Sequence, residues 1–121
     1  MVKALFDTNI LIDHLQGIRA ARTEIERYED RAISIMTWIE LLVGATVANE
    51  PRVRILLADF RTVALDEDVA EEAASLRRAH RMKLPDAVIW ASARRSGRLL
   101  VTRNVKDFPP NDPGVREPYK L

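Results

Sequence analysis

Five polar side chains of this sequence occur where buried strands are expected to end or helices to begin. Carboxylates gathered in one cleft repel each other unless a cation neutralises them or some of them bind protons. Oxygen ligands without His or Cys select hard cations such as Mg²⁺ or Mn²⁺. Such ions lower the pKa of a bound water and stabilise charge on a phosphate, which suits phosphodiester hydrolysis. The five residues are Asp7, Glu40, Asp86, Asn104 and Asp107.

Each of these residues also has an ordinary structural interpretation. The segment 7–9, Asp-Thr-Asn, is typical of a strand-to-helix turn with capping side chains, and Asp13 is expected as a surface or capping residue. Glu40 follows Thr37 at the spacing of a capping box. An acid in a first helical turn, such as Asp86, is favourable without any ligand. Asn104 and Asp107, which follow the fourth expected strand, could simply shape a loop. The metal site is favoured because all five residues are expected at the same edge of a sheet.

The apolar segments alternate between strand-like and helical spacing along the chain. This alternation predicts an α/β fold with a mostly parallel sheet and helices on both of its faces. Ligand sites in such sheets lie at the carboxyl ends of the strands. The expected strands are residues 2–6, 32–35, 62–65, 98–102 and, as a short edge strand, 115–117.

The composition suits one domain over residues 1–121, with 47% apolar residues. The absence of Cys excludes disulfides, zinc–thiolate sites and thiol nucleophiles, and only two His residues argue against a histidine-rich metal site. The formal net charge of +1 gives no strong attraction to nucleic acid or membrane, so a polyanion site must come from local clustering. No segment has the pattern of a signal peptide or approaches a membrane span, so we expect a cytoplasmic protein.

Four segments carry the candidate residues: LFDTNILID (5–13), ISIMTWIELLVGA (33–45), KLPDAVIWASA (83–93) and LLVTRNVKDF (99–108). In this order they resemble PIN-domain ribonucleases, and more specifically VapC-type toxins of type II toxin–antitoxin pairs. The resemblance implies a PIN-like three-layer sandwich with a sheet of about five strands. It also implies a Mg²⁺- or Mn²⁺-dependent endoribonuclease that hydrolyses RNA, a homodimer and a cognate antitoxin.

The resemblance assigns roles to individual residues. Asp7, Glu40 and Asp86 match the three acidic positions of the family site, so they are the expected catalytic residues and metal ligands. Asn104 stands at a fourth position that is often Asp in the family, and Asp107 matches a further acidic position that completes the catalytic set. Because an amide oxygen carries no charge, we expect one well-occupied metal.

Four neighbouring residues are expected to contact the substrate or to shape its site. Thr8 and Asn9 are expected to fix the turn after the first strand and to form hydrogen bonds within the site. Thr102 and Arg103 follow the fourth strand, where a phosphate could be held. Arg103 has the alternative of a solvated surface charge.

Basic residues cluster late in the chain, since residues 77–106 hold nine Lys or Arg and one acid. Those around the last buried strand are expected to guide RNA phosphates to the metal, with helix-end charges as the alternative. They are Arg94, Arg95, Arg98, Arg103 and Lys106. Some apolar side chains are expected to exceed the core and to form a dimer or antitoxin interface. These side chains are expected among Ile10, Leu11, Leu15 and the apolar positions near Leu41, Leu42, Leu56 and Leu57.

Two other functions compete with the nuclease. A receiver-like phosphoacceptor domain is also α/β with magnesium near strand ends, and Asp66 after the third strand would be its acceptor. Such a domain needs clustered acids after its first strand, where this chain supplies Asp7 alone. A catalytically silent PIN-like scaffold would bind partners without a competent metal site, and Asn104 keeps this alternative open.

Overall fold

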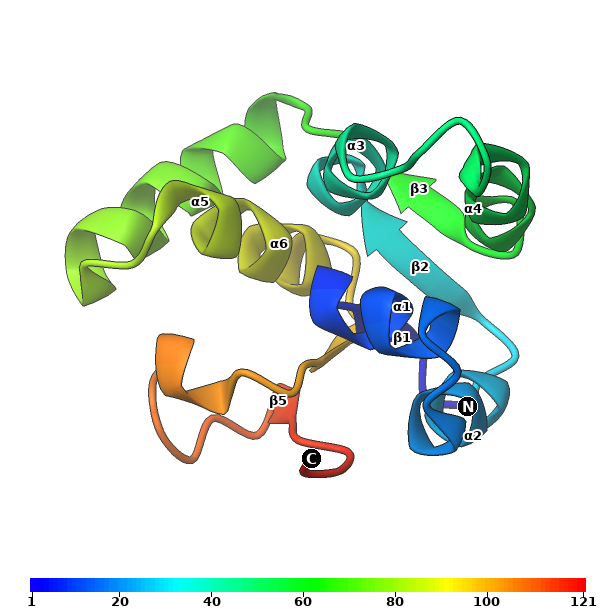
Figure 1. Ribbon diagram of the computed structural model, residues 1–121. Coiled ribbons are helices and arrows are strands. Elements are labelled where there is room, and N and C mark those ends of the chain that lie inside the picture. Colours follow the sequence, from blue (N-terminus) through cyan, green and yellow to red (C-terminus); the bar gives the residue numbers. More distant parts are fainter.

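A computed structural model describes residues 1–121. Its centre is a five-stranded sheet of order β3-β2-β1-β4-β5, in which every neighbouring pair is parallel (Figure 1). The sheet confirms the expected topology, including the short edge strand near the end of the chain. The strands are β1 (Ala4–Phe6), β2 (Arg31–Ser34), β3 (Arg61–Val63), β4 (Leu99–Val101) and β5 (Val115–Arg116).

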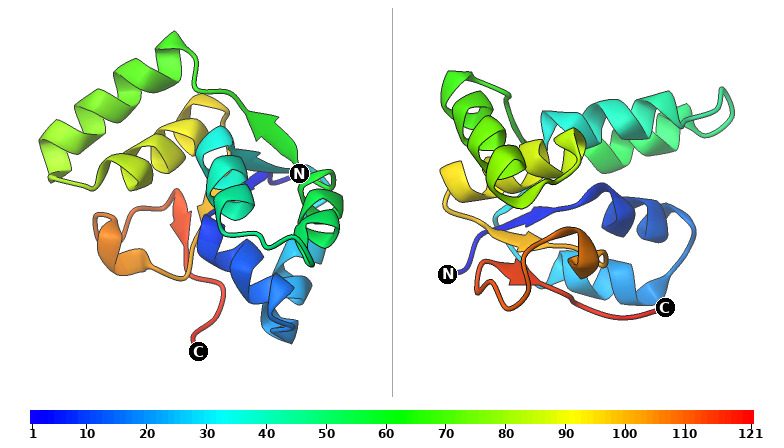
Figure 2. Two further views of the ribbon diagram at one scale, coloured as in Figure 1. Left: turned by 45° about the horizontal axis from the view of Figure 1, so that its top comes forward. Right: turned by 90° about the vertical axis from the view of Figure 1, so that its left-hand side faces the viewer.

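Helices cover both faces of this sheet, as the alternation of segments predicts (Figures 1 and 2). The helices are α1 (Thr8–Leu15), α2 (Arg19–Glu26), α3 (Ile35–Val43), α4 (Glu50–Leu57), α5 (Glu67–His80) and α6 (Leu84–Arg95), with a 3₁₀ turn η1 (Val105–Asp107). None of them has the length and apolarity needed to cross a bilayer.

Alternate residues of the strands belong to two separate cores. Phe6 and Ile33 pack in the core that contains side chains of α1, α2, α3 and α4. Leu5 and Leu100 point to the opposite face, where α5 and α6 cover the sheet. Because successive strand side chains point to opposite faces, these short apolar strands supply both cores and make a three-layer sandwich.

Several apolar residues expected at an interface lie in the core instead. Ile10 and Leu11 are fully buried, and Leu41, Leu56 and Leu57 are nearly so. The prediction was wrong for these five because the sequence does not show which helix faces meet the sheet. The large apolar side chains that stay exposed on α1, α3, α4 and the α3–α4 loop are Ile12, Ile39, Val43, Val47 and Ile55.

The start of α3 corrects the capping-box prediction. β2 ends at Ser34, and the Ser34 hydroxyl caps the helix by accepting a hydrogen bond from the Met36 N–H at 3.0 Å. Thr37 therefore lies inside the helix and is fully buried, and Glu40 lies beyond the first turn. Neither residue belongs to a cap, so Glu40 is left for another role.

We predict that Ser34→Ala lowers the free energy of unfolding by about 0.5–2 kcal/mol, because it removes the acceptor of a first-turn N–H. Ser34→Gly should cost only a few tenths of a kcal/mol, since Gly is also tolerated at this position. Urea denaturation measures both values. An Ala variant that is as stable as the wild type would show that the hydroxyl does not cap α3.

Candidate active site

Asp7 follows the last residue of β1 and caps α1 with its own carboxylate. Its Oδ1 accepts the Thr8 N–H at 2.7 Å, and its Oδ2 accepts the Thr102 hydroxyl at 2.8 Å and the Asn9 amide at 3.4 Å. The side chain is buried, and burial raises the pKa of the Asp7 carboxyl, although the hydrogen bonds from Thr102 and Thr8 oppose the rise. Glu40 and Asp107 add to the rise in the pKa.

Thr8 connects the turn after β1 to α3. Its hydroxyl donates to Glu40 Oε1 at 2.7 Å and lies 2.9 Å from the hydroxyl of the buried Thr37. Since Thr8 donates its single proton to Glu40, Thr37 must donate to Thr8. Glu40 is exposed, so this chain of hydroxyls is what holds its carboxylate near Asp7.

Asp86 lies in the first turn of α6, where the helix dipole favours an acid. Burial and, after it, the charges of Asp7, Asp107 and Glu40 raise the pKa of Asp86 to about 6, although Lys83 opposes the rise. The four carboxylates are thus close enough to disfavour each other's charge. The structure brings together the four acids that the sequence singles out.

This cluster fits a hard divalent cation in charge and in donor type. Its donors are carboxylate oxygens, and Lys83 is the one cation found to oppose the rise in the pKa of Asp86. No three of the acidic side chains converge closely enough to hold one ion in the conformation described. The assignment of individual metal ligands therefore stays a prediction.

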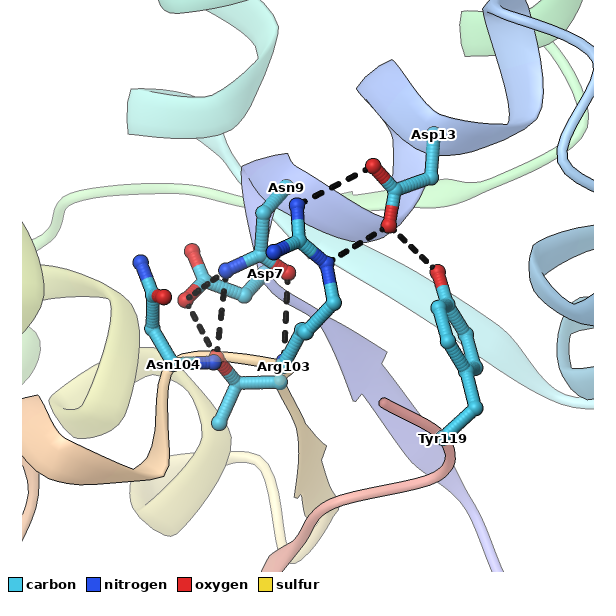
Figure 3. A network of polar contacts seen from close by, with 7 residues as sticks. Asp7, Asn9, Asp13, Arg103, Asn104 and Tyr119 are labelled. Atoms are coloured by element: carbon cyan, nitrogen blue, oxygen red, sulfur yellow. Dashed lines mark hydrogen bonds and ion pairs between the residues drawn. The ribbon is translucent and has the colours of Figure 1, made fainter. Parts of the chain in front are cut away.

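Residues after β4 support Asp7 from one side (Figure 3). The Thr102 hydroxyl is fully buried; besides donating to Asp7, it accepts the Asn9 amide at 3.3 Å and the Asn104 N–H at 3.0 Å. Asn9 also accepts the Arg103 N–H at 3.2 Å. The Asn104 side chain is exposed at the rim of the cluster. Thr102 and Asn9 thus act on the site through Asp7, and their contact with a substrate stays a prediction.

A buried ion pair lies behind this loop and corrects the expectation for Asp13. Asp13 is only 2% exposed. Its carboxylate accepts hydrogen bonds from Arg103 Nε at 2.8 Å, from Arg103 Nη2 at 3.1 Å and from the Tyr119 hydroxyl at 2.7 Å (Figure 3). Burial and the Asp13 carboxylate raise the pKa of Tyr119. Arg103 is therefore engaged with Asp13, and its predicted contact with a phosphate remains untested. No local sequence pattern marks Asp13 as a buried residue, since its partners lie far along the chain.

Most of the basic residues expected to guide RNA are engaged elsewhere. Arg94 pairs with Glu72 of α5, and Arg95 pairs with Asp68 and Glu72. Arg98 precedes β4, at the sheet edge opposite to the acids, and donates to Asp30 at 2.8 Å. Ion pairing across the fold is not visible in the sequence, and contact of these three residues with RNA stays a prediction. Lys106 alone of the five forms no ion pair.

The acid expected for a phosphoacceptor has an ordinary structural role. Asp66 caps α5 by accepting the Val69 N–H at 2.9 Å. Glu40 and Asp107 raise the pKa of Asp7 and of Asp86, and Asp66 is not among the acids that do so. The geometry therefore does not favour a receiver-like function.

Comparison with known proteins agrees with this geometry. The PIN domain family profile matches residues 4–109. Ribonuclease VapC10 of Mycobacterium tuberculosis is 36% identical over 113 residues, which cover 87% of this chain and 85% of that protein. A toxin–antitoxin complex from Klebsiella pneumoniae contains a chain that is 44% identical, with a TM-score of 0.92, over 98% of this chain and 100% of that one.

A more distant structure shares the fold alone. VapBC2 from Rickettsia felis, solved with a DNA fragment from its promoter, is 20% identical with a TM-score of 0.80 over 95% of this chain and 96% of that one. The residues matched by the family profile include four of the five strands and all four acids. The chain therefore belongs to the PIN-domain family, and within it to the VapC type.

Proposed function

We propose that residues 1–121 form one nuclease domain, a metal-dependent endoribonuclease that acts as the toxin of a toxin–antitoxin pair. The observation that carries the proposal is the cluster of four carboxylates at the carboxyl edge of the sheet. The relative named Ribonuclease VapC10 supports RNA as the substrate. Because the proposed substrate is RNA, we also propose that the protein acts in the cytoplasm.

In this proposal Asp7, Glu40 and Asp86 hold a Mg²⁺ or Mn²⁺ ion, with Asp107 and the Asn104 amide beside them. The bound ion would supply an activated water and stabilise charge on the phosphate. The chain itself provides the positioning. The Thr102 hydroxyl orients the Asp7 carboxylate by a hydrogen bond of 2.8 Å, and the Thr8 hydroxyl orients the Glu40 carboxylate by one of 2.7 Å. Because Asn104 brings no charge, we propose one well-occupied ion.

The proposed protein partners are a cognate antitoxin and a second copy of the chain. The relative from Klebsiella pneumoniae, described as a toxin–antitoxin complex, supports the antitoxin at 44% identity. The exposed apolar residues on the α3–α4 side supply surface for such contacts. They include Ile39, Val43, Val47 and Ile55. Isolated apolar side chains are normal on surfaces, but several on one pair of helices favour an interface.

The proposal predicts that RNA cleavage requires Mg²⁺ or Mn²⁺ and stops with EDTA. Asp7→Asn and Asp86→Asn should abolish cleavage while the protein stays folded, because each removes a charge with little change in volume. Mapping of RNA ends with the purified protein and each variant measures the activity. Full cleavage in chelator would refute the metal dependence. A wild-type protein that neither binds metal in a titration nor cleaves RNA would favour the silent scaffold.

The stability of the metal-free protein should depend on pH through Asp86. Its folded pKa of about 6 lies above the ordinary Asp value of 3.8, so the folded state binds the proton more tightly than the unfolded state. Stability from this group is therefore full below the unfolded pKa and falls as the pH rises to about 6. Urea denaturation in EDTA should show this fall in the wild type and a flatter profile in Asp86→Asn. Identical profiles would contradict it.

Glu40 and Thr8 should act together. Glu40→Gln keeps the volume and leaves α3 intact, because the Ser34 hydroxyl caps that helix. We expect near-native stability with cleavage lost. Thr8→Val removes the donor to Glu40 and should lower kcat, whereas Thr8→Ser keeps the hydroxyl and should retain most activity. An active Glu40→Gln enzyme, or a Thr8→Val variant with wild-type kcat, would remove these residues from the proposed site.

A further inference from the structure

Most basic side chains of this protein have partners. Ten of the nineteen Lys and Arg residues form ion pairs, and two more, Arg31 and Arg52, donate to backbone carbonyls. Seven cations are left, and five of these are exposed at one end of α5, in the turn to α6 and on η1. We call these five the basic rim: Arg77, Arg78, Arg81, Lys83 and Lys106.

The basic rim borders the carboxylate cluster. The end of α5, the turn to α6 and η1 lie on the left in Figure 1 and in the left-hand view of Figure 2. Lys83 is near enough to Asp86 to affect the pKa of that acid. Lys106 precedes Asp107 on η1. A ligand at the acids therefore has Lys83 and Lys106 beside it, and the end of α5 leads directly into the turn that holds Lys83.

The separation of charge along α5 sets the rim apart from ordinary solvated charges. The acids of α5 lie toward its beginning, where Asp68 and Glu72 are paired with arginines of α6. No acid occurs between residues 77 and 85. The helix dipole favours the basic residues of the last turn of α5, but it does not account for Lys83 and Lys106, which lie outside that helix.

The chemistry of the rim fits a chain of phosphates. A phosphodiester bound at the acids carries further phosphates on both sides, and these need cations because the carboxylates repel them. We infer that the basic rim binds the RNA phosphates that flank the cleaved bond. This inference rests on the proposed function. It replaces Arg94, Arg95 and Arg98, whose charges are engaged in ion pairs, as the residues that guide RNA.

The test measures binding separately from cleavage. All variants carry Asp7→Asn and are kept in EDTA, and a labelled single-stranded RNA of mixed sequence is titrated by fluorescence anisotropy over a range of KCl concentrations. For single strands each lost phosphate contact lowers the slope of log K against log salt by about 0.7. We expect weaker binding by Arg77→Ala/Arg78→Ala, with a slope shallower by about 1.4. Lys83→Ala and Lys106→Ala should each lower it by about 0.7.

Two controls separate charge from structure. Arg19→Ala removes an exposed, unpaired cation at the start of α2, away from the rim, and should leave binding unchanged. Arg77→Lys/Arg78→Lys keeps the charge and should restore the salt slope. Circular dichroism confirms that each variant is folded, since Ala is the best helix former and should not unfold α5.

The same substitutions in the protein with Asp7 intact should raise KM for RNA and leave kcat within a factor of two, because the rim contacts no reacting atom. Wild-type affinity and salt slope in Arg77→Ala/Arg78→Ala would overturn the inference and leave the rim to another acidic partner. Absence of cleavage by the wild type would instead refute the proposed function, while the binding data would still decide the role of the rim.

Discussion

Repulsion between carboxylates is the constraint on which the arrangement of this protein depends. A parallel sheet brings the ends of its strands and the beginnings of its helices to one edge, and this chain places acids at that edge from four separate segments. Burial and, after it, the charges of the neighbouring acids raise the pKa of Asp7 and of Asp86, which means that the fold stabilises their charged forms poorly. A fold that keeps such a cluster is suited to a cation.

The surrounding polar groups hold the acids in place in spite of this repulsion. Because β1 and β4 are neighbours, the end of β4 presents the Thr102 hydroxyl to Asp7, and the Asp7 N–H donates to Val101 at 2.9 Å. The Asp13–Arg103 pair then ties the loop after β4 to α1. Buried ion pairs contribute little net stability in many proteins, so the role of this one is better understood as fixing a single geometry.

The sequence predicts the fold and the membership of the acidic cluster, because both follow from short-range patterns. Alternating strand and helix spacing gives the parallel sheet, and the position of each acid relative to its own strand or helix places it at the edge. The cap of α3 shows the limit of such patterns: Thr37 and Glu40 have the right spacing, but β2 runs directly into the helix and Ser34 takes the role. Asp13 is a stronger case, since its partners Arg103 and Tyr119 lie 90 and 106 residues away.

The same limit explains why the basic residues divide into two classes that the sequence does not separate. Packing of α5 against α6 brings Arg94 and Arg95 to acids near the beginning of α5, which neutralises them. The end of α5 contains no acids, so the cations there have no partner for an ion pair. The carboxylate cluster alone would repel a phosphate chain. The basic rim alone would bind the phosphate chain but would not bind a metal ion. Placed side by side, the centre can hold a metal ion while the rim offsets the repulsion of the neighbouring phosphates, so ion pairing within the helical layer determines where a polyanion can approach the site.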